Sequence, residues 1–208
     1  MVFVLMLIII SLACNMTPQQ IQKGAGLLTD DFTGADGGWS VWSKTGESAV
    51  SVIDGKLTMI LQQPNTDIIT TNDISHPDLQ ISVNAQLEHG SRDNLIGLVC
   101  RFQNDKNYYG FVISSDGYFG VIRKYQGETK LLNSSQMEFS ETINQGNIEN
   151  DLEAICAGES LVFSINAVEV ASVNDGNLEF GGNGLLIGSF DTPNDLVVSF
   201  DDFKLTAR

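Results

Sequence analysis

The chain has 208 residues, 42% of them hydrophobic, which is enough to bury one sizeable core. Its 26 aspartates and glutamates outnumber 11 lysines and arginines, so the formal net charge is −15. A surface this acidic repels phosphate backbones and anionic lipid headgroups, which excludes nucleic acid as an expected partner and charge as a means of membrane attachment. Solubility outside a cell accounts for most of this acidity, and some of the carboxylates are candidates for binding calcium.

The chain opens with an apolar run, VFVLMLIIISLA, that ends just before Cys14. The run is shorter than the roughly 20 residues that span a bilayer, but it suits the hydrophobic region of a signal peptide. The residues ISLAC, Ile10 to Cys14, resemble the lipobox of bacterial lipoproteins. This resemblance implies that Cys14 is acylated and becomes the new amino terminus; an ordinary signal peptide or an anchor is the alternative.

These features predict a signal peptide over residues 1–13 and a lipidated cysteine with a polar tether over 14–27. Residues 28–208 then form one domain, held by its lipid anchor alone at the outer face of a bacterial membrane. Of the three cysteines, Cys100 and Cys156 remain as a pair in a compartment that permits disulfides. Both alternate with apolar residues and so face the core, where they either bridge or stay reduced; we favour the disulfide.

The domain has the period of two that is typical of β-strands, with no convincing helix. The clearest strand is Gln80 to Glu88, in which every second residue from Ile81 to Leu87 is apolar. Turns separate such runs at Asp54-Gly55, Asp116-Gly117 and Ala157-Gly158-Glu159, and the longest stretch without strand character is a loop over Asn133 to Asn150. The pattern predicts an all-β, antiparallel β-sandwich of about a dozen strands.

One hairpin carries a family resemblance. The sequence from Gly97, GLVCRFQNDKNYYGFVISSDGYFGVIRKYQG, resembles a hairpin of concanavalin A-like domains, including the laminin G-like group and a domain related to family 16 glycoside hydrolases. DDFTGADGGWSV and LVVSFDDFKL resemble the first and last strands of that family, and SLVFSINAVEV resembles its asparagine-glycine hairpin with Ala167 replacing glycine. The resemblance implies a jelly roll with its first and last strands side by side, and leaves the activity open.

A glycosidase needs two carboxylates that flank the scissile bond. Glu149, Asp151 and Glu153 alternate along one strand, similar to the acidic strand of family 16 hydrolases, and are weak catalytic candidates. Asn150 stands where that family has a hydrophobic residue, so an ordinary solvent-facing strand is the better interpretation. His76 and His89 lie next to turns without metal-ligand spacing. We therefore expect no catalytic site.

Sugar recognition needs flat aromatic rings and planar polar groups. The resembling hairpin concentrates both, which makes its tyrosines and arginines the candidate ligand-binding residues: Arg101, Tyr108, Tyr109, Arg123 and Tyr125. We expect Arg101 to point away from the core, with a structural ion pair as its alternative role. Trp39 and Trp42 face opposite ways, so we expect one in the core and the other exposed.

Two pairs of acids are weak candidates for a structural calcium site. Asp30-Asp31 and Asp201-Asp202 fall on the strands that the resemblance makes neighbours, and paired carboxylates are unfavourable unless a cation relieves them. No other cofactor is expected. The sequence thus favours an anchored module that binds an extracellular glycan or other surface ligand, over an adhesive domain without a small-molecule site or, less favoured, a family-16-like hydrolase.

Overall fold

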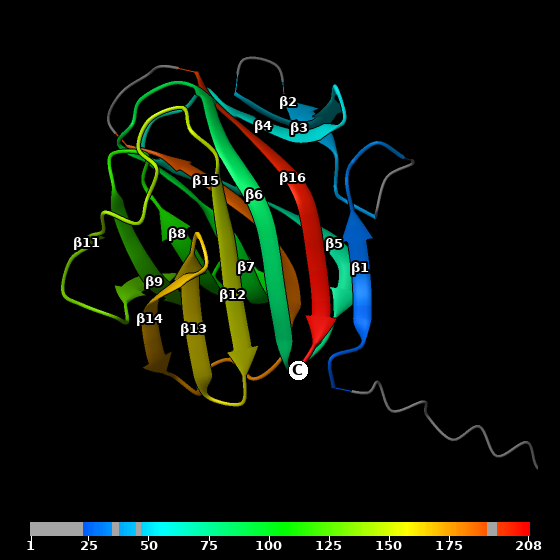
Figure 1. Cartoon of the computed structure of the whole chain (residues 1–208), viewed down its shortest axis with the longest axis vertical. Helices are drawn as coiled ribbons and strands as arrows, with labels where there is room; N and C mark the ends of the chain where they lie inside the picture. Colours follow the sequence, from blue (N-terminus) through cyan, green and yellow to red (C-terminus); the bar gives the residue numbers. More distant parts are fainter. Residues whose placement is uncertain (1–22, 35–37, 45–46, 191–194) are drawn as a thin grey trace, which may run out of the picture.

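A computed structural model describes residues 23–34, 38–44, 47–190 and 195–208, which form sixteen β-strands and no helix (Figure 1). No helix within these residues is therefore available to cross a membrane. The predicted signal peptide and Cys14 lie outside the described residues. The prediction of an all-β chain is confirmed, with more strands than the dozen or so that the sequence indicates.

The strands form two antiparallel sheets. The nine-stranded sheet contains, in spatial order, β14 (Val168–Asn174), β13 (Ser160–Ile165), β12 (Asn150–Ala157), β6 (Leu79–His89), β16 (Leu196–Ala207), β4 (Lys56–Leu61), β3 (Ser48–Ile53) and β2 (Trp42–Lys44), with β1 (Gly26–Asp30) also paired to β16. The seven-stranded sheet contains β10 (Glu128–Leu131), β9 (Tyr118–Tyr125), β8 (Asn107–Ile113), β7 (Asn94–Asn104), β15 (Gly182–Ser189) and β5 (Thr66–Ser75), with β11 (Glu138–Phe139) also paired to β9. The first and last strands lie side by side, as predicted.

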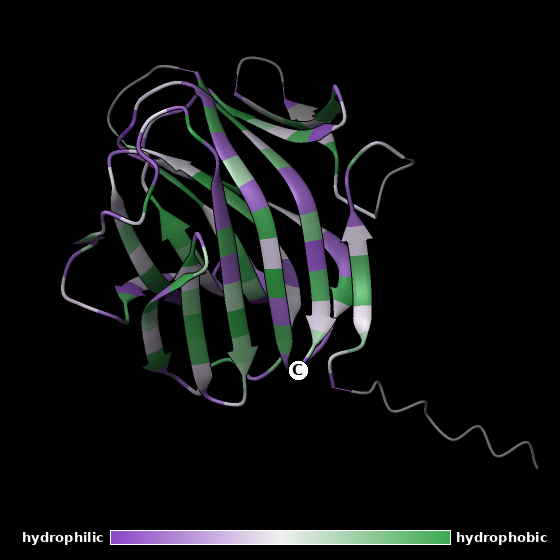
Figure 2. Cartoon of the chain, in the orientation of Figure 1, coloured by the Kyte–Doolittle hydropathy of each residue, from purple (hydrophilic) through white to green (hydrophobic). Residues whose placement is uncertain are grey.

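The core lies between the two sheets, which face each other as layers in Figure 1. On β6 the residues Ile81, Val83, Ala85 and Leu87 are at most 2% exposed, while the polar residues between them face solvent. Figure 2 shows this alternation as bands along β6. Burial of one face of each strand is what holds the layers together, at about 25 cal/mol for each Å² of apolar surface removed from water.

Two hairpins have the two-residue loops expected from the sequence. Asp54 and Gly55 join β3 to β4 with φ angles of 51° and 75°. Asn166 and Ala167 join β13 to β14 with φ angles of 51° and 65°. Positive φ at both positions is the geometry that matches strand twist, and it is strained for Ala167 because alanine carries a Cβ.

A disulfide links the two sheets across the core. It joins Cys100 on β7 to Cys156 on β12, and both residues are at most 1% exposed. The bond therefore joins two strands that belong to different sheets and share no backbone pairing.

The prediction that Arg101 points away from the core is wrong. The pairing of β7 with β8 shifts after Cys100, and Arg101 has a φ of 51°, so the alternation of side chains breaks at this bulge. Its side chain is buried, with the whole residue only 1% exposed. The guanidinium donates hydrogen bonds to the carbonyls of Pro77, Gly158 and Leu178 at 3.2, 2.6 and 2.7 Å. Arg101 thus ties three loops together at one end of the sandwich.

Candidate functional site

The outer face of the seven-stranded sheet carries a second apolar cluster, separate from the core. Val99, Tyr108, Val112 and Leu186 are at most 1% exposed, although their chain neighbours face the sandwich interior. Partly buried residues complete this cluster: Ile69, Leu95, Phe102, Ile122 and Met137. An apolar outer face is unusual for an antiparallel sheet, whose second side is normally solvated. It forms the floor of two adjoining hollows.

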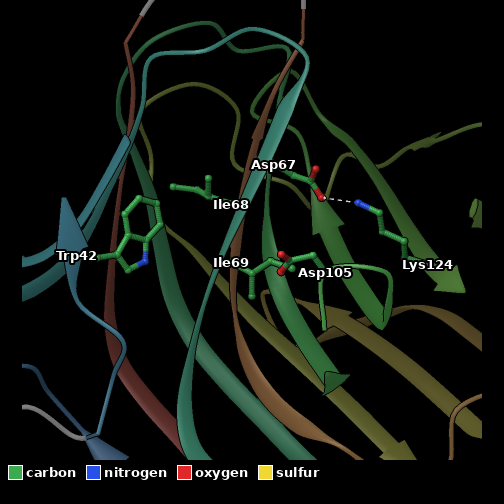
Figure 3. A pocket seen from close by; sticks show the side chains of 6 residues that line it. All are labelled: Trp42, Asp67, Ile68, Ile69, Asp105 and Lys124. Carbon is green, nitrogen blue, oxygen red and sulfur yellow. Dashed lines mark hydrogen bonds and ion pairs between the residues drawn. The ribbon is translucent and has the colours of Figure 1, made fainter. Parts of the chain in front are cut away.

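The first hollow has a volume of about 230 Å³ and lies around strand β5 (Figure 3). In that view Trp42 and Ile68 lie on one side of β5, while Asp67, Asp105 and Lys124 lie on the other. The second hollow, of about 260 Å³, shares Asp67 and Lys124 with the first. Ligand pockets usually measure about 300–1,000 Å³, so the two hollows together offer the room of an ordinary small-molecule site.

The second hollow owes its open floor to the absence of a side chain at Gly188. This glycine pairs with Leu95 across the sheet, and a Cβ built on it would lie 3.2 Å from the Leu95 side chain. Leu95, Tyr108 and Ile122 supply the apolar floor, and Phe190 supplies an aromatic ring at 37% exposure. The hollow therefore combines apolar surface with the polar groups described next.

Three polar groups meet where the two hollows join. Lys124 Nζ lies 3.4 Å from Asp67 Oδ2, and the Tyr108 hydroxyl donates a hydrogen bond of 2.8 Å to the same oxygen. Lys124 also lies 5.6 Å from the centre of the Tyr108 ring, a cation–π arrangement. Burial, together with the Asp67 carboxylate, raises the pKa of Tyr108, so its hydroxyl stays protonated and donates at all physiological pH values.

This arrangement presents a fixed carboxylate and a fixed ammonium beside apolar and aromatic surface. Side-chain exposures of 38% for Asp67 and 21% for Lys124 leave both groups accessible to a ligand. Carboxylate and ammonium groups bind hydroxyls, and aromatic rings pack against the apolar faces of flat ligands. The chemistry suits recognition of a molecule that has many hydroxyls and apolar faces.

Of the five residues predicted to bind a ligand, Tyr108 lines the second hollow, and Arg101 lines a separate hollow of about 270 Å³ among the loops that it ties together. The other three line neither the first nor the second hollow. Tyr109 faces the core and donates a hydrogen bond of 2.6 Å to Asp175 Oδ1, and burial with this contact raises its pKa to about 12. Arg123 pairs with the same carboxylate at 2.5 Å, and Tyr125 packs against the core 5.8 Å from the Arg123 guanidinium. Arg101, Tyr109, Arg123 and Tyr125 thus make contacts within the protein, and ligand binding by these residues stays a prediction.

Lys124 and Asp67 were missed by the sequence reasoning. Lys124 sits between Arg123 and Tyr125 and so faces the opposite side of β9 from both. The signal was present, because the buried Phe119 and Val121 fix which face of this strand points inward. Asp67 has no comparable signal, since an aspartate near a strand end is ordinary.

The weak catalytic candidates lie on the other side of the molecule. Glu149 precedes β12. On β12 the alternate residues Leu152 and Ala154 are buried, so Asp151 and Glu153 point outward from the nine-stranded sheet. Gln80 donates a hydrogen bond of 2.5 Å to Glu153. Burial, and then the Glu153 carboxylate, raises the pKa of Asp151. None of the three lines either hollow described above.

The acids proposed for calcium already accept hydrogen bonds from the protein. Asp30 accepts from the Phe32 amide and the Trp39 indole at 2.9 and 3.0 Å. Asp31 accepts from Thr33, Asp201 from the Asp202 amide, and Asp202 from Asn84. Within the described ranges no group of three or more histidines, cysteines or acids is placed to hold a metal ion. Calcium at these residues stays a prediction.

No protein-family model matches the chain, and no curated protein matches it by sequence. Solved structures do. Carbohydrate binding module CBM66 from Bacillus subtilis superposes with a TM-score of 0.64 at 15% identity, over 82% of this chain and 96% of that one. A Bacillus licheniformis β-glucanase gives 0.64 at 10% identity, over 90% of this chain and 100% of that one.

A Bacillus subtilis protein of unknown function with a galectin-like fold also gives a TM-score of 0.64, at 14% identity over 90% of this chain and 98% of that one. Sequence identities this low establish a shared fold but not a shared activity. They confirm the jelly-roll sandwich of the concanavalin A-like type that the sequence predicts.

Proposed function

We propose that this chain is a non-catalytic glycan-binding module of an exported, lipid-anchored protein, and that it binds its glycan on the outer face of the seven-stranded sheet. The observation that carries the proposal is the meeting of Asp67, Lys124 and Tyr108 above an apolar floor. Hydrogen-bonding groups fixed beside apolar surface are what a sugar ring requires from its site.

The structural neighbours support the same class of ligand. They include a carbohydrate binding module and a β-glucanase, so this fold accommodates glycans in other proteins. The anchor part of the proposal rests on the sequence of residues 1–14 alone. It predicts that Cys14→Ser moves the protein from the membrane fraction of the producing cell to the soluble fraction.

The glycan is found by affinity electrophoresis of the full chain, purified in mild detergent, through gels that contain one soluble polysaccharide each. The panel contains mixed-linkage β-glucan, xylan, levan and dextran as neutral glycans, and polygalacturonate and heparin as acidic ones. We expect retardation by at least one neutral glycan. Migration unchanged in every gel would contradict the proposal and favour an adhesive domain.

Tryptophan fluorescence then locates the binding. Trp42 lines the first hollow, whereas Trp39 is 4% exposed and packs against Phe32 and Phe203 in the core. Glycan binding should change the emission of the wild type and of Trp39→Phe, and should leave that of Trp42→Phe unchanged. The same mixtures are assayed for new reducing ends, because their release would show a glycoside hydrolase in place of a binding module.

A further inference from the structure

A third hollow lies beside the other two. Its volume is about 420 Å³, and Phe190 lines both it and the second hollow. Strand β9 begins here at Tyr118, which also lines the third hollow together with Asp116 of the preceding turn. The three hollows therefore adjoin one another, from the edge strand β5 across the outer face of the seven-stranded sheet.

Tyr118 gives the third hollow an aromatic wall, and a second ring next to the hollow holds it in place. Tyr118 is 41% exposed and packs edge-to-face against Phe139, which is 52% exposed, with ring centres 5.6 Å apart. The two residues face each other across the pairing of β11 with β9, so the backbone holds the rings in place. Gly117, at a φ of 105°, makes room for them, because a Cβ there would lie 2.7 Å from the Phe139 ring. Rings this exposed contribute little to the core.

Asp116 contributes an acceptor that the fold leaves unused. Its Oδ1 is buried and has no hydrogen-bond partner within the described part of the chain. A buried acceptor without a partner costs about 1–3 kcal/mol, and natural proteins retain few of them. Asp116 lines the third hollow, so a ligand hydroxyl that reached this oxygen would supply the missing donor.

The charges of the three hollows exclude an acidic ligand. Four aspartates are among their described lining residues, namely Asp67, Asp93, Asp105 and Asp116, against Lys124 as the one cation. Lys124 is itself neutralised by Asp67. A chain of uronic acids or sulfated sugars therefore meets an excess of carboxylates in these hollows, whereas an uncharged sugar is not repelled by them.

We propose that the three hollows form one groove for an extended, uncharged oligosaccharide, in which Tyr118 and Asp116 form an end subsite that stacks against one sugar ring and accepts one of its hydroxyls. This inference rests on the proposed function and adds to it the length and charge class of the ligand. It also assigns binding roles to two residues at the far end of the groove from Trp42.

The test measures the affinity of the wild type, Asp116→Ala and Tyr118→Ala for a ladder of oligosaccharides, from disaccharide to hexasaccharide, prepared from the neutral polysaccharide that the gels identify. For the hexasaccharide, we expect affinity to fall about tenfold in Asp116→Ala and about fivefold in Tyr118→Ala. For the disaccharide, which the first two hollows accommodate, both variants should match the wild type. Phe180→Ala is the control, since Phe180 is 54% exposed and lines none of the three hollows.

Equal hexasaccharide affinity in all four proteins would overturn the end subsite, and so would a wild-type affinity that does not grow with chain length. Binding of polygalacturonate or heparin as tight as that of the neutral glycan would overturn the charge class. Either result leaves glycan binding itself standing, whereas a wild type that binds no glycan of the panel contradicts both proposals. Thermal unfolding checks that Asp116→Ala is folded. Tyr118→Ala is a second test of the subsite, and because Tyr118 is exposed, its loss should not disturb the fold.

Discussion

The disulfide between the sheets allows a quantitative prediction of stability. Cys100 and Cys156 are separated by 56 residues in sequence. Closing a loop of this length removes chain entropy from the unfolded state that is equivalent to about 4 kcal/mol of stability at 25 °C. Small domains are stable by about 5–15 kcal/mol in total, so this one bond accounts for a large fraction of the margin.

The double variant Cys100→Ala/Cys156→Ala should therefore unfold at much lower urea concentration. With a denaturant slope of about 2 kcal/mol per molar, a loss of 4 kcal/mol lowers the midpoint by about 2 M. Wild type unfolded and refolded in excess reductant is the matched control and should give nearly the same midpoint as the double variant. Midpoints of variant and oxidised wild type within about 0.3 M of each other, with equal slopes, would refute the loop-entropy reasoning.

Three further predictions concern the scaffold. Arg101→Met leaves three carbonyls, one of them the buried carbonyl of Leu178, without their charged donor, and should lower the free energy of unfolding by about 3 kcal/mol in urea titrations. A loss below about 1 kcal/mol would contradict its role as a tie between loops. Ala167→Gly relieves the positive φ of 65° and should raise the unfolding midpoint by about 2–4 °C, whereas a lower midpoint would show that the turn is unstrained. Although burial opposes its charge, hydrogen bonds from Tyr109 and Asn177 and the Arg123 ion pair hold the pKa of Asp175 below its usual 3.8. The stability that the Asp175 carboxylate contributes is therefore complete above pH 3.8 and is lost as the pH falls through its lower pKa in the folded state. Asp175→Asn should be less stable than wild type at pH 7, and the stability of the two proteins should converge near pH 2. A stability difference independent of pH would contradict this.

The sequence predicted the parts of the fold that depend on strict alternation. In β6 polar and apolar residues alternate without interruption, so both the strand and its buried face could be assigned. The Asp54-Gly55 loop was equally clear, because this pair favours a two-residue hairpin, whereas the Asn166-Ala167 loop was expected from the family resemblance. The absence of strands from 133 to 150 was also predicted well, apart from the short β11.

The candidate site was harder to predict because β7 is apolar on both faces. Leu95, Ile96, Leu98 and Val99 give no polar positions to show which side faces the core, so the second cluster could not be recognised from the pattern. The bulge at Arg101 then reverses which side chains after it point toward the core. No residue type in the sequence indicates this bulge. Such irregularities arise from contacts between distant loops, which a single strand's sequence does not contain.

The most direct test of the central claim compares two lysines on opposite faces of the sandwich. Lys124 lies between the hollows of the seven-stranded sheet, whereas Lys204 is exposed on the outer face of the nine-stranded sheet, between the buried Phe203 and Leu205. Calorimetric titration of the best neutral glycan into the wild type, Lys124→Ala and Lys204→Ala should show affinity about tenfold lower for Lys124→Ala and unchanged for Lys204→Ala. Equal affinity in all three proteins, or a loss confined to Lys204→Ala, would place the glycan elsewhere and contradict the account.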